Sequence, residues 1–183
     1  SLDGGPTGVS EMELIDNTLF DGTLVLASAD GQVLPFGAPN DGSVRTGATL
    51  AVGEYAPIGA EAESSELRVQ VSGNGAATKV TVIDEDGVHT RFITRTAPTA
   101  AGEAKFITDA VWDSVTGETT SYRYDGQGRV TDIIAPKPDG VTTECVPGKP
   151  VAGCRILRLS YVTATGNGDY QGRLKSITAQ AGT

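Results

Sequence analysis

The feature that most constrains this fold is a set of Asp-Gly and Asn-Gly dipeptides between short stretches of alternating apolar and polar residues. Asp-Gly begins at residues 3, 21, 30, 41, 86, 125 and 139, and Asn-Gly begins at residues 74 and 167. Glycine accepts a positive φ without steric cost, and Asp or Asn tolerates one better than most residues do. Such a pair between two alternating runs therefore predicts a β-hairpin.

The stretches between these turns have a period of two, which places successive side chains on opposite faces of a sheet. This pattern predicts hairpins over residues 24–36, 79–93 and 122–134, and a longer one that joins 156–162 to 174–179. The best helical window, residues 61–67, is short and lacks a cap at its far end. We expect an all-β fold whose antiparallel hairpins form a curved sheet or a segment of a β-shell.

Charge differs between the two halves of the chain. Residues 1–90 hold 14 acidic and 3 basic side chains, a net of −11, and residues 91–183 hold 9 acidic and 11 basic ones, a net of +2; together they give the chain's −9. We expect an acidic β-rich part over residues 1–79 and a hairpin part over 80–183, joined as one continuous structural unit. The acidic part is either a solvated surface that keeps a secreted protein soluble or a face for something basic.

The composition argues against two classes of partner. A net charge of −9 argues against nucleic-acid binding, which needs a basic surface. No apolar run approaches the roughly eighteen residues of a membrane-spanning helix, so we expect no membrane insertion. The chain begins at Ser1 without methionine, and we interpret it as a processed form or a piece of something larger.

A proline-rich stretch over residues 135–150 interrupts the hairpin pattern, and we expect an insertion between two strands because proline cannot donate to a β-ladder. Shorter weak joints lie at 38–47 and 96–102. Cys145 and Cys154 fit a structural disulfide in an oxidising compartment. Free thiols are the second possibility. A metal or redox role is disfavoured because the cysteines do not form a Cys-x-x-Cys pair.

The most informative motif is the stretch TTSYRYDGQGRVTDIIAP at residues 119–136. It resembles the YD repeat of Rhs proteins, in which an aromatic-rich strand ends in Tyr-Asp, turns at Gly-Arg and returns on an alternating strand. The matching residues are Tyr122, Tyr124, Asp125, Gly128, Arg129, Ile133 and Pro136. A second, degenerate copy at 161–178 keeps Gly172 and Arg173, with Tyr170 and Gln171 in place of the Tyr-Asp pair. Residues 83–92 look like the Asp-Gly hairpin that precedes such repeats.

The resemblance covers residues 80–178 and is to secreted, teneurin-like Rhs/YD-repeat proteins of actinobacterial type, at the start of the repeat region. It implies that the tyrosines pack on a half-buried sheet face. Asp125 would bond its own turn, and Arg129 would lie over a tyrosine or pair with Asp125. Repeated hairpins bury their apolar faces by stacking on neighbours. The family's hairpins coil into a hollow shell associated with toxin domains, so the implied partners are neighbouring repeats, other copies and a toxin domain.

Three features of the sequence could carry chemistry, and each also has a plainer structural role. His89 could join a Ser-His-Asp triad, but an ordinary strand position is favoured. Asp84-Glu85-Asp86 lacks the EF-hand spacing and is expected to form a turn. Trp112 could be a sugar-stacking platform, but a core or sheet-edge position is favoured. We expect no enzyme activity, no metal site and no cofactor.

Two functions are compatible with these features. The first is a non-enzymatic structural segment of a secreted or surface-associated Rhs/YD-repeat protein, contributing to a shell or fibre. The second is a carbohydrate- or protein-binding β-sandwich module on the cell surface, with a surface glycan as one possible ligand. Sheet edges open to further strands favour the first, and exposed aromatic residues in a groove favour the second. Both functions place the protein outside the cell.

Overall fold

The computed structural model describes residues 9–15, 23–28, 31–39, 50–96, 104–163 and 171–182. The fold is all-β, as predicted, and the chain forms two compact units, Ser1–Val115 and Thr116–Thr183. The sequence predicted a division between residues 79 and 80, but in the first unit the strand Arg68–Ser72 pairs with the strand Lys79–Ile83 across this point.

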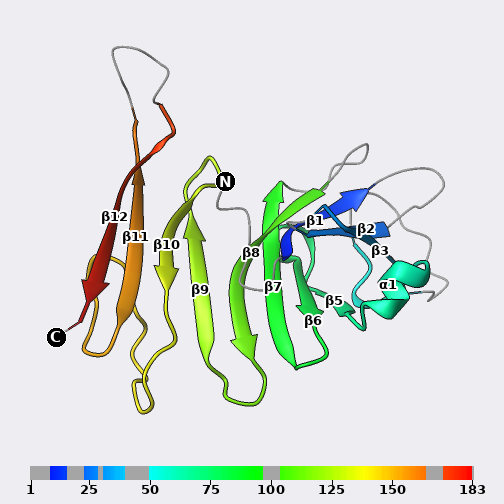
Figure 1. Cartoon of the computed structure of the whole chain (residues 1–183), viewed down its shortest axis with the longest axis horizontal. Helices are drawn as coiled ribbons and strands as arrows, with labels where there is room; N and C mark the ends of the chain where they lie inside the picture. Colours follow the sequence, from blue (N-terminus) through cyan, green and yellow to red (C-terminus); the bar gives the residue numbers. More distant parts are fainter. Residues whose placement is uncertain are drawn as a thin grey trace. The chain divides into compact units, whose positions relative to one another are not determined.

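The first unit is a ring of antiparallel strand pairings. Its strands are β1 (Val9–Ile15), β2 (Thr23–Ser28), β3 (Val33–Gly37), β4 (Gly53–Pro57), β5 (Arg68–Ser72), β6 (Lys79–Ile83), β7 (Val88–Thr96) and β8 (Ala104–Asp113). Each pairs with the next along the chain, and β1 also pairs with β8 (Figure 1). The unit also contains α1 (Ala60–Ser64) and the 3₁₀ turn η1 (Gly75–Ala77). The pairings return to their starting strand, so one face of these strands turns inward.

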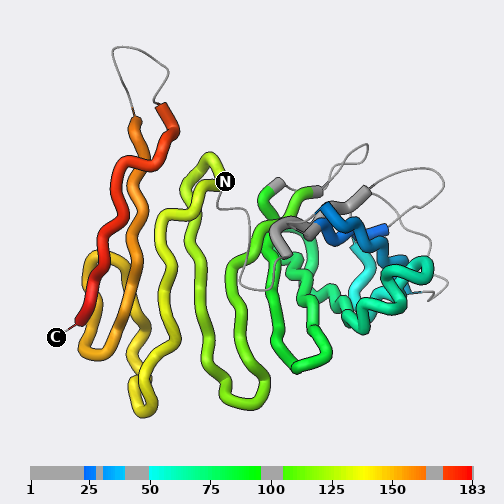
Figure 2. Tube along the Cα trace, in the orientation of Figure 1, coloured from blue at the N-terminus to red at the C-terminus, as the bar shows by residue number. Residues whose placement is uncertain are grey.

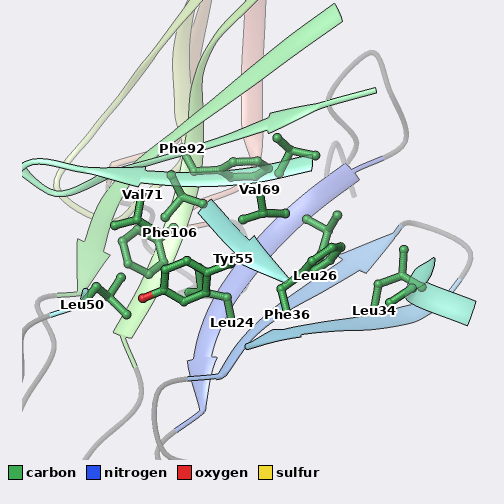
Figure 3. Packing of buried hydrophobic residues seen from close by; sticks show 13 residues of the cluster. Leu24, Leu26, Leu34, Phe36, Leu50, Tyr55, Val69, Val71, Phe92 and Phe106 are labelled. Carbon is green, nitrogen blue, oxygen red and sulfur yellow. The ribbon is translucent and has the colours of Figure 1, made fainter. Parts of the chain in front are cut away.

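The inward face holds the main hydrophobic core. Figure 3 shows its aromatic and aliphatic side chains gathered between the strands. Phe36, Phe92 and Phe106 are fully buried, and Tyr55 is nearly so. The cluster is completed by Leu24, Leu26, Leu34, Leu50, Ala62, Val69, Val71, Val80 and Val82. Burial alternates along the strands, as in the exposed–buried–intermediate–buried–exposed pattern of β5, because period two sends every other residue inward.

The second unit is an antiparallel meander of four strands. They are β9 (Thr119–Tyr124), β10 (Val130–Ile134), β11 (Arg155–Tyr161) and β12 (Leu174–Ala181). Figure 2 follows the chain up and down through these strands to the C-terminus. The meander is not closed, because β12 pairs with β11 alone within the described residues.

The three predicted hairpins occur. Leu24 lies opposite Phe36 and Lys79 lies opposite Ile93, so the ends of the first two ranges pair. In the third, Tyr122 lies opposite Ile133 and not Ile134, and the register shifts between Val130 and Asp132. The fourth hairpin is β11–β12, and residues 164–170 of its loop lie outside the described residues, as do residues 29–30 of the first turn. A short helix forms near the helical window at 61–67, but it begins at Ala60 and ends at Ser64 (α1). The weak joints at 38–47 and 96–102 lie mostly outside the described residues.

The proline-rich stretch is an insertion between β10 and β11, as predicted, and it contains the expected disulfide. Cys145 and Cys154 are bonded, with their Cα atoms 5.6 Å apart. Both are buried against Ile134 and Ile156 of the sheet. The insertion also contacts the end of β12, where the Gly182 amide donates to the Cys154 carbonyl at 3.0 Å. The disulfide loop therefore covers one face of the second unit's sheet at its β10–β11 end.

Candidate functional site

The turn of the β9–β10 hairpin is held by hydrogen bonds to one carboxylate, that of Asp125. One oxygen of Asp125 accepts hydrogen bonds from the amides of Gln127 and Arg129, both at 2.9 Å. The other accepts from Nε of Arg129 at 2.8 Å and lies 2.7 Å from its Nη2. Gly128 has a φ of +77°, a conformation that disfavours residues with a Cβ. Asp, Gly and Arg at this spacing thus make one closed turn between β9 and β10.

The Asp125 carboxyl is electrostatically held in its charged form. Burial by itself would raise its pKa, but the hydrogen bonds from the Arg129 amide, the Arg129 guanidinium and the Gln127 amide together lower the pKa below its usual value. A lowered pKa in the folded state means that the charged form stabilises the fold above the ordinary aspartate pKa of about 3.9. This contribution is lost as the pH falls through the folded-state pKa.

We expect Asp125→Asn to lower the stability of the second unit at neutral pH by about 1–2 kcal/mol, because the substitution removes the charge that faces Arg129. The difference from the wild type should shrink as the pH falls from about 5 toward 2, where the native carboxyl is also neutral. Urea unfolding followed by far-UV circular dichroism at several pH values measures it. Asp139→Asn, in an exposed turn, controls for the change in net charge. An unchanged difference at low pH would contradict the electrostatic account.

Arg129 also connects its hairpin to the next one. Its guanidinium carbon lies 4.4 Å from the centroid of the Tyr161 ring, at the end of β11. The Tyr161 hydroxyl donates to the Val130 carbonyl at 2.7 Å. A Cβ on Gly172 would lie 3.3 Å from Arg129 Nη1, so the arginine also packs against the turn of the β11–β12 hairpin. The sequence predicted that Arg129 would cover a tyrosine or pair with Asp125; the structure shows both, and the tyrosine belongs to the next hairpin.

The two hairpins of the second unit begin their return strands in the same register. The Asp125 amide donates to the Arg129 carbonyl at 3.0 Å, and the Val162 amide donates to the Arg173 carbonyl at 2.9 Å. Tyr124 lies opposite Val130, and Tyr161 lies opposite Leu174. Gly172, with a φ of +83°, holds the place of Gly128.

This register corrects one sequence alignment. Tyr161 and Val162 occupy the positions of Tyr124 and Asp125, which the sequence had assigned to Tyr170 and Gln171. Gly172 and Arg173 were aligned with the matching residues. The second hairpin has a longer loop, so the residue next to Gly-Arg in sequence is not the last residue of the strand.

Two tyrosines of the second unit, Tyr122 of β9 and Tyr161 of β11, are partly buried on the sheet. Tyr122 is half-buried opposite Ile133, and burial raises the pKa of its hydroxyl. Burial is also the main cause that raises the pKa of Tyr161, with the charge of Asp125 adding to it. The rings therefore pack on the sheet.

The β6–β7 hairpin in the first unit repeats the same turn. Oδ1 of Asp84 accepts from the amides of Asp86 at 3.1 Å and Val88 at 2.9 Å, and Gly87 has a φ of +81°. Asp84 therefore fixes a turn, as the sequence favoured. Among the described residues, no group of three or more His, Cys, Asp or Glu side chains is arranged to hold a metal ion.

His89 and Trp112 lie opposite each other on β7 and β8. Their rings are stacked, with centroids 4.9 Å apart and planes inclined by 21°. Arg91 lies 5.9 Å from the Trp112 ring and makes a two-point contact with Asp109 at 2.8 and 2.9 Å. All four side chains are partly buried, and the group packs as a cross-strand cluster on the sheet.

Comparison with known proteins gives no relative: no family model, no curated protein and no solved structure matches this chain. In the part of the chain that the structure describes, no helix is long and apolar enough to cross a membrane.

Proposed function

We infer that this chain is a non-enzymatic structural segment of a secreted or surface-associated Rhs/YD-repeat protein. In this role its hairpins contribute to a β-shell or fibre that encloses or presents a toxin domain. Its partners are neighbouring repeats of the same chain or other copies of the protein.

The observation that carries this proposal is the contact between successive hairpins. Arg129, which closes one turn, lies over Tyr161, which ends the first strand of the next hairpin. The turn motif therefore connects one hairpin to the next as well as closing its own hairpin. A contact from each hairpin to the next is what a wall of stacked hairpins requires.

The disulfide and the charge support a location outside the cell. A buried disulfide forms and persists most readily in an oxidising compartment. The acidic excess of the chain favours solubility of a secreted protein.

Size-exclusion chromatography with light scattering, together with a glycan array, tests the proposal. A wall segment with open strand edges is expected to self-associate as its concentration rises and to bind no glycan. A monomer that binds glycans at micromolar strength would support the alternative, a carbohydrate-binding surface module. Trp112→Ala would then test whether the chain's one tryptophan stacks on the sugar.

A further inference from the structure

We propose that the outer edge of β12 accepts one further antiparallel strand in a fixed register, and that the strand it fits reads apolar–x–apolar–x–Tyr. The inference deepens the proposed function, on which it rests, by naming the chemistry of the partner. It is drawn from the likeness between β12 and β10, whose outer edge already carries such a strand.

The outer edge of β12 offers backbone groups for pairing. In an antiparallel ladder, alternate residues direct their N–H and C=O groups to opposite sides of the strand. The Gly182 amide bonds Cys154, on the β11 side, so the backbone groups of Ala179 and Ile177 point the other way. Seven of the eight residues of β12 are exposed.

The β12 strand repeats β10 position by position. Val130 and Leu174 lie opposite the tyrosine that ends the preceding strand, a β-bulge follows in both, and Ile133 then corresponds to Ile177. The correspondence also predicts which backbone groups face outward. On β10 the Ala135 amide bonds the Arg155 carbonyl of β11 at 2.9 Å, and its equivalent on β12 is Ala179.

The contacts that β10 makes with β11 define the strand that β12 would accept. Ile133 lies opposite Leu157, and the Arg129 guanidinium lies over Tyr161, four residues further along. The accepted strand would accordingly place an apolar residue opposite Ile177 and a tyrosine against Arg173. The pattern is that of Leu157–Tyr161 in this chain, LRLSY.

Exposed apolar surface marks the same edge. Ile177 is 58% exposed, whereas its counterpart Ile133, flanked by β11, is only partly exposed. Leu174 is 43% exposed. A strand that docks on β12 as β11 docks on β10 would cover these side chains. The burial of their apolar surface would favour binding of the strand.

Disulfide trapping with a synthetic peptide of residues 155–162 tests the register on the full chain carrying Thr178→Cys. Thr178 corresponds to Ile134, which lies opposite Ile156, so a peptide with cysteine in place of Ile156 should cross-link. The position is a non-hydrogen-bonded pair, where the Cα separation of about 4.5 Å suits a disulfide. The native Cys145–Cys154 bond is buried and should not exchange.

A second peptide, with cysteine in place of Arg158, is the matched control. Arg158 lies opposite Thr178 in the native β11–β12 pairing, so this peptide would cross-link only if it displaced β11. We expect at least about fivefold more product with the first peptide, and about a tenfold loss when its tyrosine is replaced by alanine. Equal cross-linking of both peptides, no cross-linking, or a symmetric Thr178→Cys dimer that forms without peptide would each overturn the proposal. Glycan binding by the chain would count against the wall function but leave the trapping result intact.

Discussion

Phe92→Ala is expected to lower the free energy of unfolding of the first unit by about 3–5 kcal/mol. Phe92 is fully buried, and Figure 3 shows its ring among the side chains of the core. Truncation removes the buried phenyl group and leaves a cavity. The surrounding paired strands cannot readily move inward to fill it. Trp112 lies in β8, so urea unfolding followed by its fluorescence reports on this unit.

The matched control is Val115→Ala, which also shortens an apolar side chain but at a position that is 87% exposed. It should change the free energy of unfolding by no more than about 0.5 kcal/mol. A loss of similar size in both variants would mean that the inward face of the strands is not the source of the unit's stability.

Removing the disulfide with Cys145→Ser and Cys154→Ser together should destabilise the second unit by about 2–3 kcal/mol. Closing a loop of this length restricts the unfolded chain by about that much in the chain-entropy model. The native sulfurs are also packed against Ile134 and Ile156, where a serine hydroxyl would need a hydrogen-bond partner. Hydrogen exchange of the β10 and β11 amides measures the loss.

Reduction of the wild type by dithiothreitol in mild urea should reproduce the effect of the double substitution. The Trp112 fluorescence transition of the first unit serves as an internal control and should not move. Exchange rates in β10 and β11 that match those of the oxidised wild type would show that the insertion does not stabilise the sheet.

The sequence predicted what is local in this fold. The hairpins at 24–36 and 79–93 were found with their end residues paired as expected, because turn chemistry and period-two alternation act within a dozen residues. The pairing of β1 with β8 was missed, since it joins segments about ninety residues apart and no short pattern encodes it.

The candidate site was predicted in part for the same reason. The contact of Asp125 with Arg129 spans four residues and follows from the motif. The contact of Arg129 with Tyr161 crosses a 20-residue insertion, from Ala135 to Cys154, so sequence spacing gave no sign of it. The alignment of the second copy failed because its loop is longer than the first, while its closing backbone bond is unchanged.

Because the same backbone bond closes both hairpins, the register of the return strand does not depend on the length of the loop. Asp125 reaches Arg129 across three residues, and Val162 reaches Arg173 across ten, yet both return strands begin in the same register with a bulge at the same place. A bulge sets the local bend and twist of a strand. The ten-residue loop therefore leaves the local bend of its return strand the same as that behind the three-residue loop.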